Sequence, residues 1–157
     1  MIDEVELQIL NSEHLDTLSR FSLPIEQERF TALPKDMLEV TEERQPIVIL
    51  HHSTPVGFFV LNSGVRVLEY TDNPNALLLT AFSIDQNHQG KGYAKGGLQQ
   101  INTLVKNCFP QCNEIVLAVN HKNISAQKVY EKVGYQDTGK RKIGKLGEQY
   151  IMSYPIS

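Results

Sequence analysis

Hydrophobic and polar positions follow two different periods along the chain, and each period predicts one kind of element. Strands are predicted where short apolar runs are bounded by turn residues, at residues 5–10, 46–52, 56–62, 76–84, 114–119, 135–141 and 149–154. The second and third runs are separated by Ser53-Thr54-Pro55 and predict an antiparallel hairpin. Residues 76–84 are apolar without alternation, which predicts a strand buried on both faces.

Helical spacing of the apolar residues begins shortly after Gly90 and Gly92, in the middle of the chain. Apolar side chains recur at steps of four, three, four and three residues, at Ala94, Leu98, Ile101, Val105 and Cys108. A second helix over about residues 123–133 should stop at Gly134, a natural left-handed cap. Nearer the N-terminus, Asn11 or Ser12 can cap a short helix through Arg20, and Pro34 can open a helix over residues 35–43.

The order of these elements predicts the fold class. Strands come first, then strand, helix, strand and helix, then two more strands. This order is typical of an α/β (or α+β) domain with a mixed sheet. The chain has 157 residues, of which 41% are hydrophobic, and no linker or repeat interrupts it. We therefore expect residues 1–157 to form a single domain.

Composition excludes several classes of protein. A net charge of −3 argues against a nucleic-acid partner, and the lack of an 18-residue apolar run argues against a membrane span. The acidic N-terminus does not resemble a signal peptide, so we expect a soluble, cytoplasmic protein with reduced Cys108 and Cys112 thiols. The histidines show no metal-ligand spacing, and we expect no metal.

The charge is divided unevenly between the two parts of the chain. Residues 1–50 hold eleven acidic and four basic residues, a net −7, and residues 51–157 hold seven acidic and eleven basic residues, a net +4. Two solvated faces would explain this division, and so would two partners of opposite charge.

The stretch Gln89-Gly-Lys-Gly-Tyr-Ala94 lies between the predicted strand 76–84 and the predicted helix. Backbone amides at a helix start bind phosphate, and glycine lets the phosphate approach the backbone. Two common phosphate motifs do not fit. Lys95 stands where a dinucleotide fingerprint needs its third glycine, and Gly92 stands where a triphosphate loop needs Ser or Thr after Lys91.

A second motif follows about thirty residues later. Asn123, Ala126, Tyr130, Gly134 and Tyr135 match the pattern Asn-x-x-Ala-x-x-x-Tyr-x-x-x-Gly-(Phe/Tyr), and Gln89, Gly92 and Ala94 match (Gln/Arg)-x-x-Gly-x-(Gly/Ala). With both motifs in order, the chain resembles the GNAT superfamily of N-acetyltransferases over residues 46–154, and less closely before them. The resemblance implies a mixed sheet of about seven strands with about four helices. It also implies a V-shaped splay between the strands at residues 76–84 and 114–120.

The same resemblance implies a donor site for acetyl-CoA. Backbone groups of Phe82 and Ile84 would pair with the pantetheine arm. The pyrophosphate would bind the motif that starts at Gln89, through the amides of Gly90, Gly92, Tyr93 and Ala94, with added charge from Lys91 and Lys95. Asn123 would contact the donor, although a helix N-cap is an equally good interpretation. Tyr130 would give a proton to the departing thiolate, because a phenol with a pKa of ~10 stays protonated at neutral pH.

The sequence defines the acceptor amine less well than the acetyl-CoA donor. The strand at 76–84 lacks a carboxylate, so Glu26, Glu28, Glu69, Asp72 or a water chain could take the proton of the amine. Residues 21–38 resemble the N-terminal region of bacterial diamine and spermidine acetyltransferases, which implies a small cationic amine or polyamine bound by Glu26, Glu28 and Glu69. A protein lysine, a protein N-terminus and a non-catalytic acyl-CoA-binding module are the alternatives. The oligomeric state is open, a homodimer included.

Overall fold

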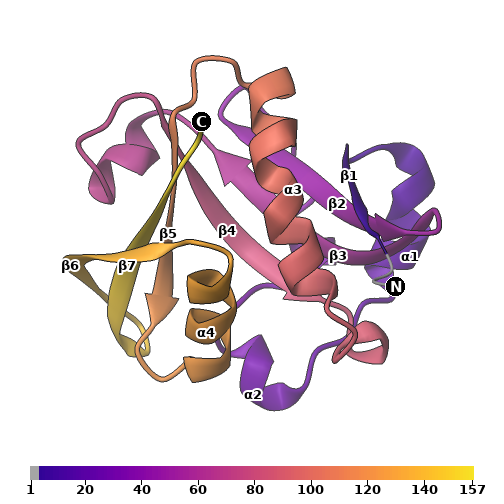
Figure 1. Cartoon of the computed structure of the whole chain (residues 1–157). Helices are drawn as coiled ribbons and strands as arrows, with labels where there is room; N and C mark the ends of the chain where they lie inside the picture. The colour runs from indigo at the N-terminus through magenta and orange to yellow at the C-terminus, as the bar shows by residue number, and fades with distance from the viewer. Residues whose placement is uncertain (1–3) are drawn as a thin grey trace.

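The computed structural model of the protein describes residues 4–157, which are arranged around one mixed β-sheet (Figure 1). Seven strands follow the order β1-β2-β3-β4-β5-β7-β6, which confirms the predicted class. β4 and β5 are parallel, and the other neighbouring strands are antiparallel. The strands are β1 (Glu6–Ile9), β2 (Arg44–His51), β3 (Thr54–Asn62), β4 (Ala76–Ile84), β5 (Glu114–Asn120), β6 (Gln136–Gly144) and β7 (Gly147–Pro155).

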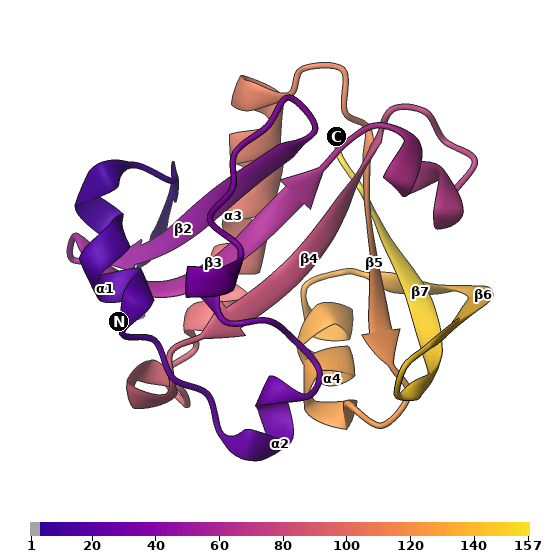
Figure 2. The same ribbon diagram turned by 180° about the vertical axis from the view of Figure 1, so that it is seen from behind.

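Four α-helices accompany the sheet. α3 crosses one face and contacts α4 on that side, and α1 lies against the opposite face (Figures 1 and 2). The helices are α1 (Leu15–Ser19), α2 (Ile25–Glu28), α3 (Tyr93–Cys108) and α4 (Ile124–Lys132). Short 3-10 helices occupy Ser12–His14, Pro34–Asp36, Val65–Glu69 and Gln86–His88.

The two parallel strands pair over only part of their length. Ala76–Leu78 of β4 pairs with Glu114–Val116 of β5, and in the described chain the pairing ends there. Beyond that point β4 and β5 diverge (Figure 1), while β5 stays paired with β7 as far as Asn120. The predicted V-shaped splay is therefore confirmed.

A β-bulge in β4 lies at the divergence. Ala81 and Phe82 lie opposite the single residue Phe59 of β3, because the register shifts between the two strands. Ala81 has φ of 55°, a left-handed conformation that is uncommon for a residue other than glycine. A bulge bends its strand and increases the local twist, so it turns β4 away from β5.

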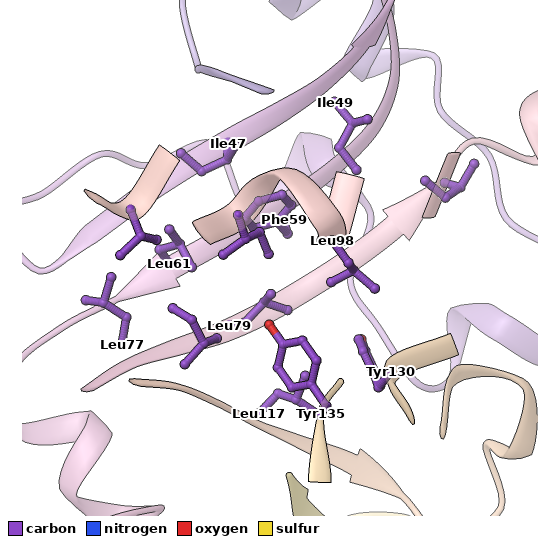
Figure 3. Close-up of a cluster of buried hydrophobic side chains, with 14 of the residues drawn as sticks. Ile47, Ile49, Phe59, Leu61, Leu77, Leu79, Leu98, Leu117, Tyr130 and Tyr135 are labelled. Atoms are coloured by element: carbon purple, nitrogen blue, oxygen red, sulfur yellow. The ribbon is translucent and has the colours of Figure 1, made fainter. Parts of the chain in front are cut away.

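Apolar side chains are buried on both faces of the sheet. The larger cluster lies under α3 and α4 and includes Ile47, Phe59, Leu79 and Leu117 (Figure 3). A smaller cluster under α1 includes Leu18, Val48 and Phe58. β4 is buried at both ends as predicted, but Thr80, Ala81 and Phe82 are only half-buried, because they line an opening in the sheet.

The predicted helix over residues 35–43 is wrong. Pro34–Asp36 forms one 3-10 turn, and residues 37–40 have no regular structure. The side chain of Arg44 explains the difference, because its Nη2 donates to the Met37 carbonyl and its Nε to the Glu39 carbonyl, both at 3.0 Å. These carbonyls are thus bound by a guanidinium group instead of by a further helical turn.

The capping residues predicted from the sequence were found at the helix ends. Asn11 caps the first helical segment, its side chain accepting from the Glu13 N–H at 2.9 Å, and Gly134 follows α4 with φ of 107°. The sequence did not predict α2, which begins directly after Pro24. The N–H groups of Gln27 and Glu28 bond to the Pro24 carbonyl, so the proline serves as the start of a helix as well as a break.

Three further findings concern the described residues as a whole. Cys108 and Cys112 are free thiols, as predicted. Within residues 4–157, no three His, Cys, Asp or Glu side chains come together as a metal site would require. None of the helices in the same residues has the length and apolar content needed to cross a membrane.

Candidate active site

A cleft of about 700 Å³ opens where β4 and β5 diverge. Its long walls are Leu79–Ile84 of β4 and Leu117–Asn120 of β5. The start of α3, the inner side of α4, the segment after α2 and the β6–β7 turn complete it. The two motifs found in the sequence therefore meet in one cavity.

The glycine-bearing turn lies at one end of this cleft. Gly90 and Gly92 have φ of 79° and 84°, and a Cβ atom on either would meet no atom within 4 Å. Gly92 is the N-cap of α3, and the first bond of the helix joins the Gly96 N–H to the Gly92 carbonyl at 3.0 Å. The amides of residues 93–95 therefore lack helical partners, and the space beside Gly90 and Gly92 is open.

Gln89 connects this turn to two other elements. Its Nε2 donates to the Ile84 carbonyl at 2.9 Å, which fixes the turn to the end of β4. Its amide also exchanges two hydrogen bonds with the amide of Gln27 on α2, at 2.9 and 3.2 Å. Gln89 lines the cleft, but its side chain is already used to position the backbone around the turn.

The other residues of the turn differ in where their side chains lie. Lys91 is exposed and does not line the cleft, whereas Lys95 does. The Tyr93 ring is buried, and its hydroxyl lies 3.0 Å from Nδ1 of His51. Tyr93 thus anchors the helix start in the core, which leaves its backbone amide as the group that could bind phosphate.

Tyr130 is positioned by α4 and lines the cleft from the side opposite β4. Its ring packs edge-on against Phe82, with centroids 6.2 Å apart, and lies 5.6 Å from the ring of Tyr135 (Figure 3). Burial raises the pKa of the Tyr130 phenol above its usual value. The side chain is therefore a protonated donor at neutral pH.

Phe82, Ile84 and Asn123 all line the cleft as well. The backbone of Phe82 lies in the bulge, beyond the last residue of β4 that pairs with β5. Asn123 caps α4, because its Oδ1 accepts from the Ala126 N–H at 3.4 Å. The capping interpretation of Asn123 is therefore confirmed, and its contact with a donor remains a prediction.

A second cavity, of about 250 Å³, continues the cleft on the far side of the bulge. It shares Thr31, Thr80, Ala81, Ala118 and Gln149 with the main cleft. Its other walls include Arg66 and Tyr70, which come from the 3-10 helix after β3 and the residue next to it. No sequence pattern indicated these residues, because each is isolated in the chain and joins the site only through the fold.

The acidic residues predicted to bind substrate lie outside both cavities. Glu26 and Glu28 are exposed on α2, and Glu69 pairs with Lys142 at 3.0 Å. No Asp or Glu side chain in the described part of the chain lines either cavity. The part of the α2 segment that does reach the cleft is uncharged or basic, at Gln27, Arg29, Phe30 and Thr31.

Comparison with known proteins gives the same family by sequence. A model of the acetyltransferase (GNAT) family matches residues 9–135. The chain is 44% identical over 158 residues to a Bacillus subtilis (strain 168) protein described as "Uncharacterized N-acetyltransferase YbbJ", covering 98% of this chain and 99% of that one. It is 30% identical over 97 residues to the spermine/spermidine N(1)-acetyltransferase of the same strain, covering 57% of this chain and 63% of that protein.

Solved structures with the same fold are more distant in sequence. The aminoglycoside acetyltransferase AAC(6')-Ib, solved with paromomycin and acetyl-CoA, has a TM-score of 0.78 at 17% identity, covering 98% of this chain and 94% of that one. The aminoglycoside N(6')-acetyltransferase of Legionella pneumophila has a TM-score of 0.71 at 16% identity, with coverage of 99% and 94%.

Proposed function

Because the chain belongs to the acetyltransferase (GNAT) family, we propose that it transfers the acetyl group of acetyl-CoA directly to a primary amine. The observation that carries this proposal is the convergence of three features in one cleft. These are the glycine-bearing turn with its open amides, the parts of β4 and β5 that do not pair with each other, and Tyr130.

The donor half of the cleft suits an extended chain that ends in a pyrophosphate. Beyond Leu78, β4 has no β5 partner, so its backbone groups there are available to pair with the amides of a pantetheine arm. The amides of Gly90 to Lys95 would hold the pyrophosphate, with Lys95 adding positive charge. Acetyl-CoA supplies the thioester, an activated acyl group.

The reaction forms a C–N bond and breaks the C–S bond of the thioester. The amine gives up one proton, and the thiolate must gain one. Tyr130 suits the second transfer, because it is protonated and lines the cleft. The hydroxyl can therefore donate to the sulfur as charge develops on it.

The proton of the amine has no carboxylate to receive it in the described cavities. We propose that an ammonium acceptor loses one proton to water before it reacts. As the C–N bond forms and the C–S bond breaks, the nitrogen loses a second proton to the solvent in the cleft, and that solvent returns a proton to Tyr130. The enzyme would then bind the neutral form of the amine, and its rate would follow the fraction of that form.

A polyamine is a second candidate for the acceptor. The relatives that act on spermine and spermidine favour it, as does the acidity of residues 1–50. The lining of the cavities gives a polyamine little support, because the described walls offer no carboxylate to its cationic groups.

The proposal is tested by thiol release from acetyl-CoA with a panel of amines: spermidine, putrescine, an aminoglycoside, free amino acids and a lysine peptide. We expect amine-dependent release by the intact protein and about 100-fold less by Tyr130→Phe. Tight CoA binding without release for any amine would favour a non-catalytic module instead.

A further inference from the structure

The second cavity carries a charge opposite to the one that a polyamine needs. Arg66 is the one charged side chain among the described residues that line it. Its other walls are mixed, with Phe30, Met37, Tyr70 and Leu78 beside the polar side chains of Thr31, Thr80 and Gln149. A guanidinium group on a cavity wall whose described residues include no carboxylate can bind an anion through charge-assisted hydrogen bonds.

Arg66 is exposed, and one long hydrogen bond joins it to a network around the buried side chain of Asn62. Its Nη1 donates to Oδ1 of Asn62 at 3.4 Å, and Asn62 is only 3% exposed. The Nδ2 atom of Asn62 donates to the Leu78 carbonyl at 2.9 Å and to Oγ1 of Thr80 at 3.0 Å. One donor of the guanidinium group therefore reaches the network that joins Asn62 to β4 next to the bulge.

The acidic residues near Arg66 do not neutralise it. Glu69 pairs with Lys142 at 3.0 Å, and Asp72 lies 4.0 Å from Lys140. Glu43 lies against Gly64, but within residues 4–157 no ion pair joins it to Arg66. Arg66 therefore keeps guanidinium donors that can bind a further group.

A polar wall group faces the same space. The hydroxyl of Thr31 is buried and has no hydrogen-bond partner in the described structure, although Thr31 lines both cavities. A buried hydroxyl without a partner costs free energy, and a ligand oxygen would offset that cost. Arg66 and Thr31 thus both offer donors to a molecule in the second cavity.

We propose that the acceptor is a small amine that carries a carboxylate, and that Arg66 binds this carboxylate. The proposal rests on the proposed acetyl transfer and names its acceptor class. The amine would point towards Thr80, Ala81 and Ala118, the walls that the second cavity shares with the donor cleft. An apolar side chain on the same molecule would pack against Phe30 and Met37.

The test compares matched pairs of acceptors. L-methionine, L-leucine and L-phenylalanine are each compared with the corresponding carboxamide, which keeps the amine and the side chain but loses the negative charge. With the intact protein, we expect at least one amino acid to exceed its amide by about 10- to 100-fold in kcat/KM, and to exceed spermidine.

Two variants connect that preference to one residue. Arg66→Ala should bring the ratio of acid to amide close to one while leaving the KM for acetyl-CoA within about twofold, and Arg66→Lys should restore part of the preference. Lys140→Ala removes an equal charge outside the cavity and should keep the full ratio. A larger effect of Arg66→Ala on acetyl-CoA than on the amino acid would overturn the proposal.

Calorimetry separates this proposal from the proposed reaction. Tyr130→Phe, loaded with CoA, should bind the amino acid more tightly than its amide even if no amine is turned over. If the amide binds or reacts as well as the acid, the carboxylate assignment is overturned and the acetyl transfer stands. If the acid is preferred but no thiol is released, the acetyl transfer fails and the carboxylate site stands.

Discussion

The side-chain amides of Gln27 and Gln89 exchange two hydrogen bonds across 62 residues of sequence, at 2.9 and 3.2 Å. The pair joins α2 to the turn that we propose binds pyrophosphate. Residues just after α2, among them Phe30 and Thr31, line both cavities. One amide pair therefore connects the donor end of the cleft to a wall of the acceptor end.

Replacing Gln27 should loosen that wall. Gln27→Ala removes both bonds of the pair but leaves the bond from Gln89 to the Ile84 carbonyl. At about 0.5–1.5 kcal/mol for each hydrogen bond, we expect a lower melting temperature and a several-fold rise in the KM of the amine. Steady-state kinetics and thermal unfolding measure both effects. Gln100→Ala, on an exposed position of α3, is the control and should change neither.

Replacing Gly92 should weaken the binding of CoA. Gly92→Ala adds a Cβ atom in the space before the helix amides and strains a backbone with φ of 84°. We expect at least a tenfold loss of affinity for CoA by calorimetry. Gly139→Ala is a matched control, because Gly139 has φ of 86°, open space around it and a place on β6 outside the cleft. If both variants lose affinity equally, backbone strain and not phosphate approach explains the effect.

Two neighbouring tyrosines separate proton donation from packing. Tyr130→Phe should lower kcat by about 100-fold with little change in the KM for acetyl-CoA. Tyr135→Phe should leave kcat unchanged, because Tyr135 does not line the cleft and its buried hydroxyl has no partner in the described structure. Removing such a hydroxyl should also keep or raise stability. Equal losses in the two variants would show that Tyr130 only packs.

The pH dependence of turnover follows from the burial of Tyr130. Burial raises the pKa of this phenol above its usual value, so it keeps its proton where a free tyrosine would begin to lose it. The kcat/KM for the amine should therefore rise with the deprotonation of the free amine, and kcat at saturating substrates should show no fall up to about pH 10. A falling limb between pH 8 and 9 that disappears in Tyr130→Phe would contradict this assignment.

The same shift predicts how stability depends on pH. Above about pH 10 the unfolded chain releases the Tyr130 proton while the folded chain keeps it, so the free energy of unfolding should decrease as pH rises. The effect of pH on unfolding by urea, compared between the intact protein and Tyr130→Phe, measures this contribution.

What the sequence predicted well was local. A helix after the glycine-bearing stretch Gln89–Ala94 and a helix end at Gly134 were both predicted, and both are found. Tyr130 could be placed because helical spacing and the order of the motifs agree. Each of these inferences needs only a few neighbouring residues.

What the sequence did not predict depends on distant contacts. The side chain of Arg44 binds the carbonyls of Met37 and Glu39, and the helix predicted over residues 35–43 does not form. The acidity of residues 1–50 suggested an acidic acceptor site, but Glu26 and Glu28 are exposed and Arg66 lines the cavity instead. Net charge along the chain does not show which few side chains point inward.

The bulge at Ala81 and Phe82 also sets a limit on how stable this sheet can be. A sheet that continued its ladder from Leu78 to Ile84 would have no seam between β4 and β5, and the cleft would be closed. The protein instead keeps two strand edges facing each other in its interior, a place where edges are normally paired. Its proposed site is thus an interrupted ladder, which the pantetheine arm of acetyl-CoA would extend under our proposal.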